Sequence, residues 1–351
     1  MSTKTNEEYF NNNPYNSEKL GEGRNIVAKQ SNFDKNKKTI YLTAHYDSTE
    51  DTTGVIDNAS GCSAILEVAK VLKDYNNEFN IGIIFFSAEE YCRVGSRNFI
   101  SKLSNDEKEN IIGCINVDMV GEKEAGDLII QSVNGRHNIL SFMMKSILSE
   151  ETKLVRGGSS DDLSFYMGEI PVITITDENS NPDLALKENQ FEYIDLNIIK
   201  KTSDIIIDFL INFELMNYEN VLKKSIEIEN TDSEIRPIDG FELVDKKDTF
   251  IGNGYSVQRE YFYQNENYNY SIIEKDRKFI DDRNLGDLNI LSKENGWWYK
   301  VIEDSDNSFI KLIFKIDGYY GEIKGNIELE QGIKILENYY ENVVGESISI
   351  E

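Results

Sequence analysis

Three short apolar runs in the first half of the chain constrain its fold most strongly, because each leads directly to acidic or imidazole side chains. Mainly apolar runs of this length are typical of strands buried on both faces, as in a parallel sheet covered by helices. In chain order, the runs and the residues that follow them are Thr39–Ala44 with His45, Asn80–Ser87 with Glu89 and Glu90, and Ile111–Val117 with Asp118. The sequence therefore predicts parallel strands that end on polar groups.

Helical patterns alternate with these strands. Apolar side chains recur at helical spacing from Ala64 to Leu72, and a long amphipathic pattern covers Leu196 to Leu215. Strands that alternate with helices predict the α/β class, with an open, mostly parallel sheet flanked by helices. We assign this fold to residues 21–217, and we expect residues 1–20, which are rich in Asn and Glu, to be loosely held.

The pattern changes near Tyr218. Residues 218–240 are polar and predict a linker, whereas residues 241–351 alternate aromatic and polar side chains. This alternation predicts a smaller β-rich accessory domain of hairpin strands buried on one face, and a closing helix is expected over Leu329–Val343. The pair Trp297–Trp298 leaves two interpretations open, because aromatic side chains in a small sheet form either its core or a binding face.

The charge balance narrows the classes of partner. With 37 basic and 63 acidic side chains the net charge is −26, and such a field repels phosphate backbones and anionic headgroups while it attracts cations and amines. Nucleic acid is therefore not expected as a partner, and no apolar run reaches the length of a membrane span. The cysteines Cys62, Cys92 and Cys114 lack CxxC spacing and predict neither a disulfide framework nor a cysteine zinc site. The first residues lack the basic-then-apolar pattern of an export signal.

Five side chains that suit metal or acid–base chemistry are expected at one edge of the predicted sheet. His45, Glu89, Glu90 and Asp118 follow strand ends, and Asp57 lies in the loop GVIDNASG before the first helix. Open α/β sheets bind their ligands at the carboxyl edge of their strands. Each residue alone has an ordinary structural explanation, and Asp57 in particular could simply cap a helix. Together they favour a zinc site, in which imidazole and carboxylates hold the ion and a free carboxylate takes a proton from water.

Five segments of the sequence resemble, in order and spacing, the double-zinc aminopeptidases of the aminopeptidase Y and secreted bacterial leucine aminopeptidase type. The segments are AHYDS (44–48), GVIDNASG (54–61), SAEEYCRVGS (87–96), NVDMVG (116–121) and SSDDLSFYMGEIPVITI (159–175). The resemblance covers about residues 24–213 and implies a zinc exopeptidase-like fold, zinc as cofactor, a peptide substrate and an extracellular or cell-envelope location. It also implies that His45 and Asp118 hold one zinc, Asp57 bridges two, Glu90 serves the second, Glu89 is the general base and Asp47 supports His45.

One ligand of the family pattern is missing. The family has a histidine after the last strand, within a pattern close to HTPxDTxxxID, whereas the corresponding stretch here is ALKENQFEYID, with Ala185 at the histidine and Asn189 at the aspartate. The chain has two histidines, and His137 lies too early in the sequence, in a predicted surface loop. Cys92 and Asp162 are lesser departures, at positions where the family has glycine and histidine.

The missing histidine affects one half of the expected site. We expect one firmly held zinc at His45, Asp57 and Asp118, and an incomplete second position at Asp57 and Glu90. Additional oxygen ligands could come from Asp177, Glu178 or Glu188. The related glutaminyl cyclases fit less well, because their single zinc resembles the half that has lost its histidine.

A metal-dependent exopeptidase, specifically an aminopeptidase, is the main functional hypothesis. The missing histidine motivates an alternative, a catalytically impaired relative that binds peptides or serves as an envelope scaffold. A third interpretation makes the β-rich accessory domain the functional part, as a module for association with the cell envelope.

Overall fold

The computed structural model describes residues 2–8, 23–148, 152–180, 190–223, 225–226, 235–275, 288–292, 295–303, 310–316, 319–345 and 350. The chain divides into two compact units. The first is Met1–Lys223 with Gly252–Ser256, and the second is Lys224–Ile251 with Val257–Glu351. Each unit contains its own eight-stranded sheet, in which the neighbours are β1-β2-β4-β3-β5-β8-β6-β7 and β13-β14-β15-β16-β12-β11-β10-β9.

The first sheet is mixed, with a parallel centre. Its strands are β1 (Ser2–Glu8), β2 (Gly23–Lys29), β3 (Thr39–His45), β4 (Asn80–Phe86), β5 (Ile111–Val117), β6 (Leu128–Ser132), β7 (Leu154–Arg156) and β8 (Val172–Asp177). The four central strands, β4-β3-β5-β8, run parallel, whereas β1, β2 and β6 pair antiparallel with their neighbours toward the centre. The expected α/β fold with a mostly parallel sheet is confirmed.

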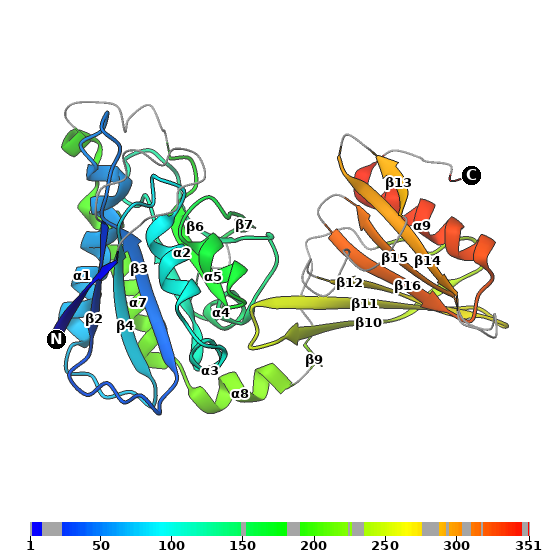
Figure 1. Cartoon of the computed structure of the whole chain (residues 1–351), viewed down its shortest axis with the longest axis horizontal. Coiled ribbons are helices and arrows are strands. Elements are labelled where there is room, and N and C mark those ends of the chain that lie inside the picture. Colours follow the sequence, from blue (N-terminus) through cyan, green and yellow to red (C-terminus); the bar gives the residue numbers. More distant parts are fainter. Residues whose placement is uncertain are drawn as a thin grey trace. The chain divides into compact units, whose positions relative to one another are not determined.

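Helices cover both faces of this sheet (Figure 1). They are η1 (Val55–Ala59), α1 (Ser60–Leu72), α2 (Val94–Ser101), α3 (Asn105–Glu109), α4 (Ile139–Met144), α5 (Asp162–Met167), η2 (Gln190–Tyr193), α7 (Leu196–Asn212) and α8 (Leu215–Lys223). On one face α1 packs against α7, where the Ser203 hydroxyl donates to the Ala64 carbonyl at 3.1 Å. On the other face Ile100 of α2 and Phe165 of α5 join the buried cluster that includes Tyr41 and Phe86 of the sheet.

The strand register brings the predicted polar groups to one edge. In β3, His45 pairs with Phe86 of β4, and Thr43 pairs with Asn116 of β5, so the carboxyl ends of the three strands are level. Asp118 follows β5 directly and therefore lies beside His45. Parallel pairing thus explains why residues far apart in sequence meet.

The N-terminal segment differs from its expectation. Residues 1–20 were expected to be loosely held, yet Ser2–Glu8 forms β1, which pairs antiparallel with β2 from Ser2↔Lys29 to Glu8↔Gly23. An edge strand is held by backbone hydrogen bonds, which do not require the apolar period that this segment lacks. The paired strand is a difference in local structure, and the loose hold expected for residues 1–20 stays a prediction.

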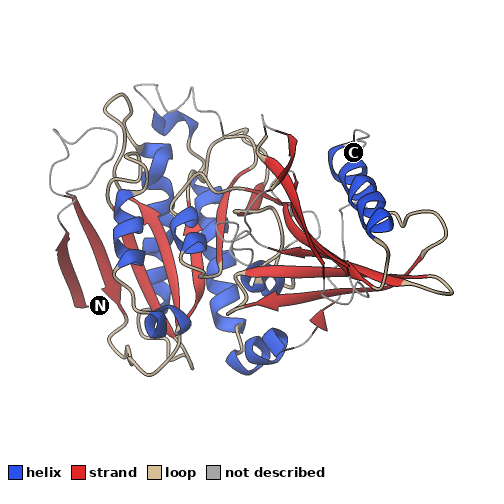
Figure 2. Cartoon of the chain, turned by 45° about the vertical axis from the view of Figure 1, so that its right-hand side comes forward, coloured by secondary structure: helices blue, strands red, loops and turns tan. Residues whose placement is uncertain are grey.

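The second unit is an antiparallel sheet with one long helix. Figure 2 shows α9 (Leu329–Val344), which ends near the C-terminus, against these strands. The strands are β9 (Ser225–Ile226), β10 (Glu242–Ile251), β11 (Ser256–Gln264), β12 (Asn269–Lys275), β13 (Asn289–Ser292), β14 (Trp297–Glu303), β15 (Ile310–Ile316) and β16 (Tyr319–Gly325). The closing helix predicted from the sequence is confirmed.

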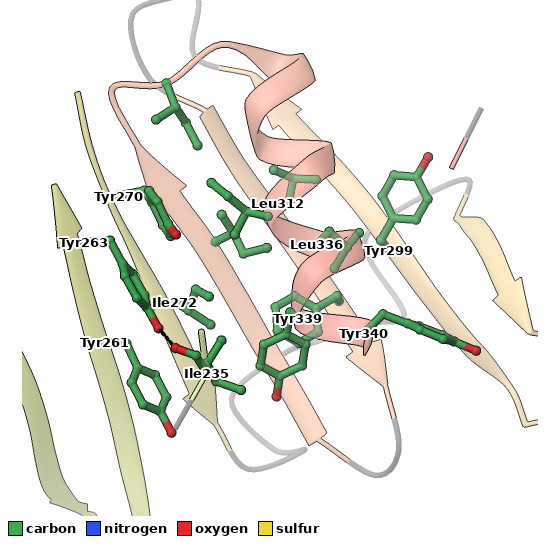
Figure 3. Close-up of a cluster of buried hydrophobic side chains, with 14 of the residues drawn as sticks. Ile235, Tyr261, Tyr263, Tyr270, Ile272, Tyr299, Leu312, Leu336, Tyr339 and Tyr340 are labelled. Atoms are coloured by element: carbon green, nitrogen blue, oxygen red, sulfur yellow. Dashed lines mark hydrogen bonds between the residues drawn. The ribbon is translucent and has the colours of Figure 1, made fainter. Parts of the chain in front are cut away.

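Aromatic side chains fill the core between α9 and this sheet (Figure 3). Tyr263 stacks on Tyr270 with ring centroids 4.7 Å apart, and its hydroxyl donates to the Ile235 carbonyl at 2.7 Å. Trp297 packs edge-on against Tyr340 of α9, whereas Trp298 is buried in a separate cluster with Ile313 and Tyr320. These aromatic residues therefore serve as core rather than as an open binding face. None of the described helices combines the length and apolar character needed to cross a membrane.

Candidate metal centre

His45 is the centre of a cluster of carboxylates. It is the last residue of β3, and its side chain is 1% exposed. The His45 Nε2 atom lies 2.9 Å from Oδ1 of Asp57 and 3.3 Å from Oδ1 of Asp118. Its other ring nitrogen, Nδ1, lies 3.0 Å from the Asp47 carbonyl oxygen, and this contact orients the ring so that Nε2 faces the two aspartates.

These three side chains offer a suitable geometry for one metal ion. Donor atoms of His45, Asp57 and Asp118 all lie within 4.8 Å of one another. Ligand atoms that bind zinc at about 2.0–2.1 Å in a tetrahedron lie about 3.3 Å apart, close to the separations around Nε2. One imidazole and two carboxylates also match the ligand types of a catalytic zinc site that keeps a position open. The residues present therefore fit a zinc ion.

The electrostatics of the cluster also favour a cation. Burial alone would lower the pKa of His45, but hydrogen bonds to Asp118, Asp47 and Asp57 raise it far above its ordinary value. Burial likewise would raise the pKa of Asp118, yet its hydrogen bonds with His45 and Ser160 bring it below the usual range. The carboxylates of Asp57 and Asp118 both face Nε2 and favour positive charge at this point, which is where a metal ion would bind.

Asp57 is carried on a tight turn. Gly54, at φ 67°, directly precedes η1, and the peptide bond between Asp57 and Asn58 is cis. The Asp57 carboxylate faces His45, and it is Asn58 Oδ1 that accepts an N–H group in the first turn of α1, from Gly61. The helix-capping explanation for Asp57 is therefore wrong.

Glu89 and Glu90 lie just beyond β4, where Asp47 holds their backbone. Ala88, at φ 58°, turns the chain out of the strand. The N–H of Glu89 donates to Asp47 Oδ1 at 3.1 Å and the N–H of Glu90 donates to Oδ2 at 3.3 Å. The Asp47 carboxylate also lies 3.7 Å from His45 Nδ1, farther than its carbonyl oxygen. Asp47 thus connects the imidazole to the paired glutamates.

Both glutamates have raised pKa values. Burial, followed by the charge of Asp161, raises the pKa of Glu89 to about 9. Burial, followed by the charge of Asp57, raises the pKa of Glu90 to about 7. A divalent cation beside them would lower both values, because it stabilises nearby carboxylates. Glu90 is not part of the three-residue donor group found among the described residues.

The remaining candidates lie apart from this group or outside the described residues. Ala185, Glu188 and Asn189 lie outside them. The Asp177 Oδ2 atom accepts the Glu122 N–H at 2.8 Å, and Glu178 forms an ion pair with Lys153. The second histidine of the chain, His137, has its Nδ1 atom 3.2 Å from the Ser141 hydroxyl. Of the two lesser departures from the family pattern, Cys92 is exposed, and the Asp162 carboxylate accepts the Gly158 and Leu163 N–H groups.

The sequence comparisons assign the chain to a family. The family model described as peptidase family M28 matches residues 25–210, more than half of the chain. The chain belongs to peptidase family M28. The family resemblance inferred from the five segments is confirmed.

Members of the M28 family and related structures match the first part of the chain. Aminopeptidase YwaD of Bacillus subtilis is 30% identical over 191 residues, which are 51% of this chain and 42% of that protein. A protein of Pyrenophora tritici-repentis described as "Probable zinc metalloprotease" is 31% identical over 142 residues, or 36% of this chain and 32% of that one. The solved aminopeptidase from Aneurinibacillus sp. strain AM-1 is 29% identical, with a TM-score of 0.50, and the match covers 53% of this chain and 47% of that one. The chain thus spans less than half the length of these relatives.

Several polar residues that support the M28 site were missed by the sequence analysis. Thr43 Oγ1 donates to Asn116 Oδ1 at 2.8 Å, and Asn116 Nδ2 donates to Ser160 Oγ at 3.0 Å. Ser160 also helps to lower the pKa of the Asp118 carboxylate, so this buried chain of hydrogen bonds leads to a candidate ligand. A sequence signal for these residues was available, since Thr43 and Asn116 are polar residues inside otherwise apolar strands. A buried polar side chain needs a hydrogen-bond partner, so each of them predicts another polar group nearby.

Proposed function

We propose that this chain is a zinc-dependent aminopeptidase that hydrolyses the first peptide bond of peptides. In this proposal His45, Asp57 and Asp118 hold the zinc and Glu89 is the general base. The observation that supports this proposal most directly is that carboxylate oxygens of Asp57 and Asp118 lie 2.9 and 3.3 Å from one nitrogen of His45, beside a pair of glutamates. Membership of family M28 and the name of the relative YwaD support the reaction class, and the zinc metalloprotease relative supports the metal.

The chemistry divides between metal and protein. When bound, zinc acts as a Lewis acid that polarises a carbonyl group and makes water more acidic. Glu89 takes a proton from the attacking water and passes it to the departing amine. Asp47 fixes the glutamates by accepting both of their N–H groups, at 3.1 and 3.3 Å, so that Glu89 remains aimed at one position.

Selectivity for free N-termini is expected from the charge around the site. Asp57 is 26% exposed and Glu90 is partly exposed, so both can reach a bound peptide. Two carboxylates beside the scissile bond attract the ammonium group of an N-terminus, and the net charge of −26 acts in the same direction. A peptide with a blocked N-terminus would lose this interaction.

One zinc per chain is part of the proposal. The position that Asp57 and Glu90 would share has no histidine in the sequence to complete it, because the chain has two histidines and His137 contacts Ser141. Zinc prefers nitrogen and sulfur ligands, and two carboxylates alone hold it weakly. The catalytic domain of the proposal is residues 21–217, and residues 241–351 form the accessory domain.

Metal dependence provides the test. Metal-stripped protein is loaded with zinc or manganese, its metal content is counted, and hydrolysis of aminoacyl chromogenic substrates is followed with and without chelator. We expect one zinc per chain, turnover that stops with chelator and returns with zinc, and little turnover of N-acetylated substrates. Zinc binding and peptide binding without turnover under any metal would instead support the non-catalytic alternative that the missing histidine motivates.

A further inference from the structure

The turn that carries Asp57 is joined to the turn that carries Asp118 by the side chain of Asn58. The Asn58 Nδ2 group donates to the Val117 carbonyl at 2.9 Å, and its Oδ1 atom accepts the Met119 N–H at 3.2 Å. Val117 and Met119 are the two residues on either side of Asp118. The Asn58 carboxamide therefore bonds the backbone on both sides of the candidate ligand Asp118. Asn58 itself directly follows the other candidate ligand, Asp57.

The surrounding sequence allows this close approach. Asn58 is 1% exposed, and its Oδ1 atom also accepts the Gly61 N–H at 3.1 Å. A Cβ atom at Gly61 would lie 2.4 Å from Asn58 Oδ1 and 2.5 Å from the Val117 carbonyl oxygen, so any larger residue would push the two turns apart. Ser60 adds a second link, because its hydroxyl oxygen accepts the Val120 N–H at 3.2 Å.

We infer that Asn58 is a positioning residue that sets the separation of the two carboxylate ligands, Asp57 and Asp118. This inference rests on the proposed function, since it requires a metal at His45. A carboxamide carries a donor and an acceptor in one plane, whereas an ionised carboxylate lacks the donor and an apolar side chain lacks both. Ligating atoms must be held within about 0.5 Å of their productive geometry, so loosening this link weakens metal binding without removing a ligand.

The experiment measures zinc affinity rather than activity alone. Metal-stripped full-length protein is titrated with zinc against a competing chromophoric chelator, for the wild type and for Asn58→Ala. Loss of a residue that orients ligands typically weakens metal binding by about 10–100-fold, and we expect a loss in this range. Saturating zinc should restore most of the turnover, because all ligands and Glu89 remain.

Asn80→Ala is the matched control. Asn80 is 2% exposed and begins β4, at the opposite edge of the same sheet. Its Nδ2 group donates to the Asp34 carbonyl at 2.7 Å and the Lys37 carbonyl at 3.0 Å, and its Oδ1 atom accepts the Asp34 N–H at 2.9 Å. Its removal should lower the melting temperature of the metal-free protein but leave zinc affinity unchanged.

Each outcome decides between the two roles of Asn58. If Asn58→Ala lowers the melting temperature as Asn80→Ala does and binds zinc as tightly as wild type, Asn58 only stabilises the fold and the inference is wrong. If Asn58→Ala does not fold, Ser60→Ala tests the same link between the two turns. We expect this variant to lose less zinc affinity, and an unchanged zinc affinity would contradict the inference. If the wild type binds no zinc, the proposed function and this inference are both wrong. If the wild type binds zinc and is active, the proposed function stands and the affinities of the variants decide the inference by themselves.

Discussion

The two sheets of this protein bury charged side chains in opposite ways. At the edge of the first sheet, a single imidazole is faced by the carboxylates of Asp57, Asp118 and, at 3.7 Å, Asp47. Nearby, burial raises the pKa of Asp161 to about 7. Negative charge therefore exceeds positive charge in a region where water screens it poorly.

In the second sheet, buried charged side chains have partners within the chain. Arg259 is 5% exposed and Asp248 is 3% exposed, and the guanidinium donates from Nε to Oδ1 at 2.9 Å and from Nη2 to Oδ2 at 3.3 Å. The Tyr339 hydroxyl of α9 donates to the buried Glu274 at 2.8 Å. The difference supports the proposed zinc ion at the first cluster, whereas Arg259 supplies the positive charge of the second.

Glu89→Gln gives the largest expected effect on the first cluster. The amide keeps the shape of the side chain but cannot accept a proton, so kcat for aminoacyl substrates should fall by about 10²–10⁴-fold. Zinc content and melting temperature should stay at wild-type values. The matched control is Glu67→Gln on α1, whose exposed carboxylate pairs with Lys70 at 3.1 Å and should leave kcat unchanged. Full activity of Glu89→Gln would mean that another group removes the proton.

Arg259→Met tests whether the second cluster is structural. It leaves the Asp248 carboxylate buried and unpaired, which typically costs about 3–5 kcal/mol. Both tryptophans, Trp297 and Trp298, lie in β14, so tryptophan fluorescence during urea unfolding reports this unit selectively. Zinc affinity and kcat should not change.

Two controls accompany the Arg259 variant. The double change Arg259→Met with Asp248→Leu should recover most of the lost stability, because no charge is left unpaired. In contrast, Lys334→Met breaks an exposed pair with Glu330 in α9 of the same unit and should leave the urea midpoint almost unchanged. A loss of zinc affinity in Arg259→Met would remove the distinction between the two clusters.

The sequence predicted the features that depend on strand ends. Parallel strands share one carboxyl edge, so His45 after β3 and Asp118 after β5 could be placed together from their positions in the chain alone. The helix over Ser60–Leu72 followed from its apolar spacing in the same way. Apolar periodicity was therefore enough to predict most of the fold of the first unit.

Features that depend on backbone atoms could not be predicted. Asn58 bonds the carbonyl of Val117 and the N–H of Met119, and every residue but proline offers the same groups, so no side-chain pattern marks the partner. Asp47 was expected to support His45, and its bonds to the N–H groups of Glu89 and Glu90 were missed for the same reason. In the second sheet, β16 lies between β15 and β12, a long-range pairing that local alternation does not specify.

Ser160→Ala gives the smallest expected effect and sharpens the comparison, because it changes a neutral group beside the first cluster. Ser160 is 6% exposed, accepts from Asn116 at 3.0 Å and helps to lower the pKa of the Asp118 carboxylate. Without this hydroxyl Asp118 loses a donor that helps to hold it ionised, so zinc affinity should fall by about 10-fold, the lower end of the range for such neighbours. The control is Ser63→Ala, whose exposed hydroxyl donates to the Ala59 carbonyl at 2.7 Å and which should bind zinc as wild type does. Equal affinities for the two variants would show that the buried hydrogen bonds below Asp118 stabilise the sheet without tuning the ligand, and that the carboxylates alone distinguish the first cluster from the second.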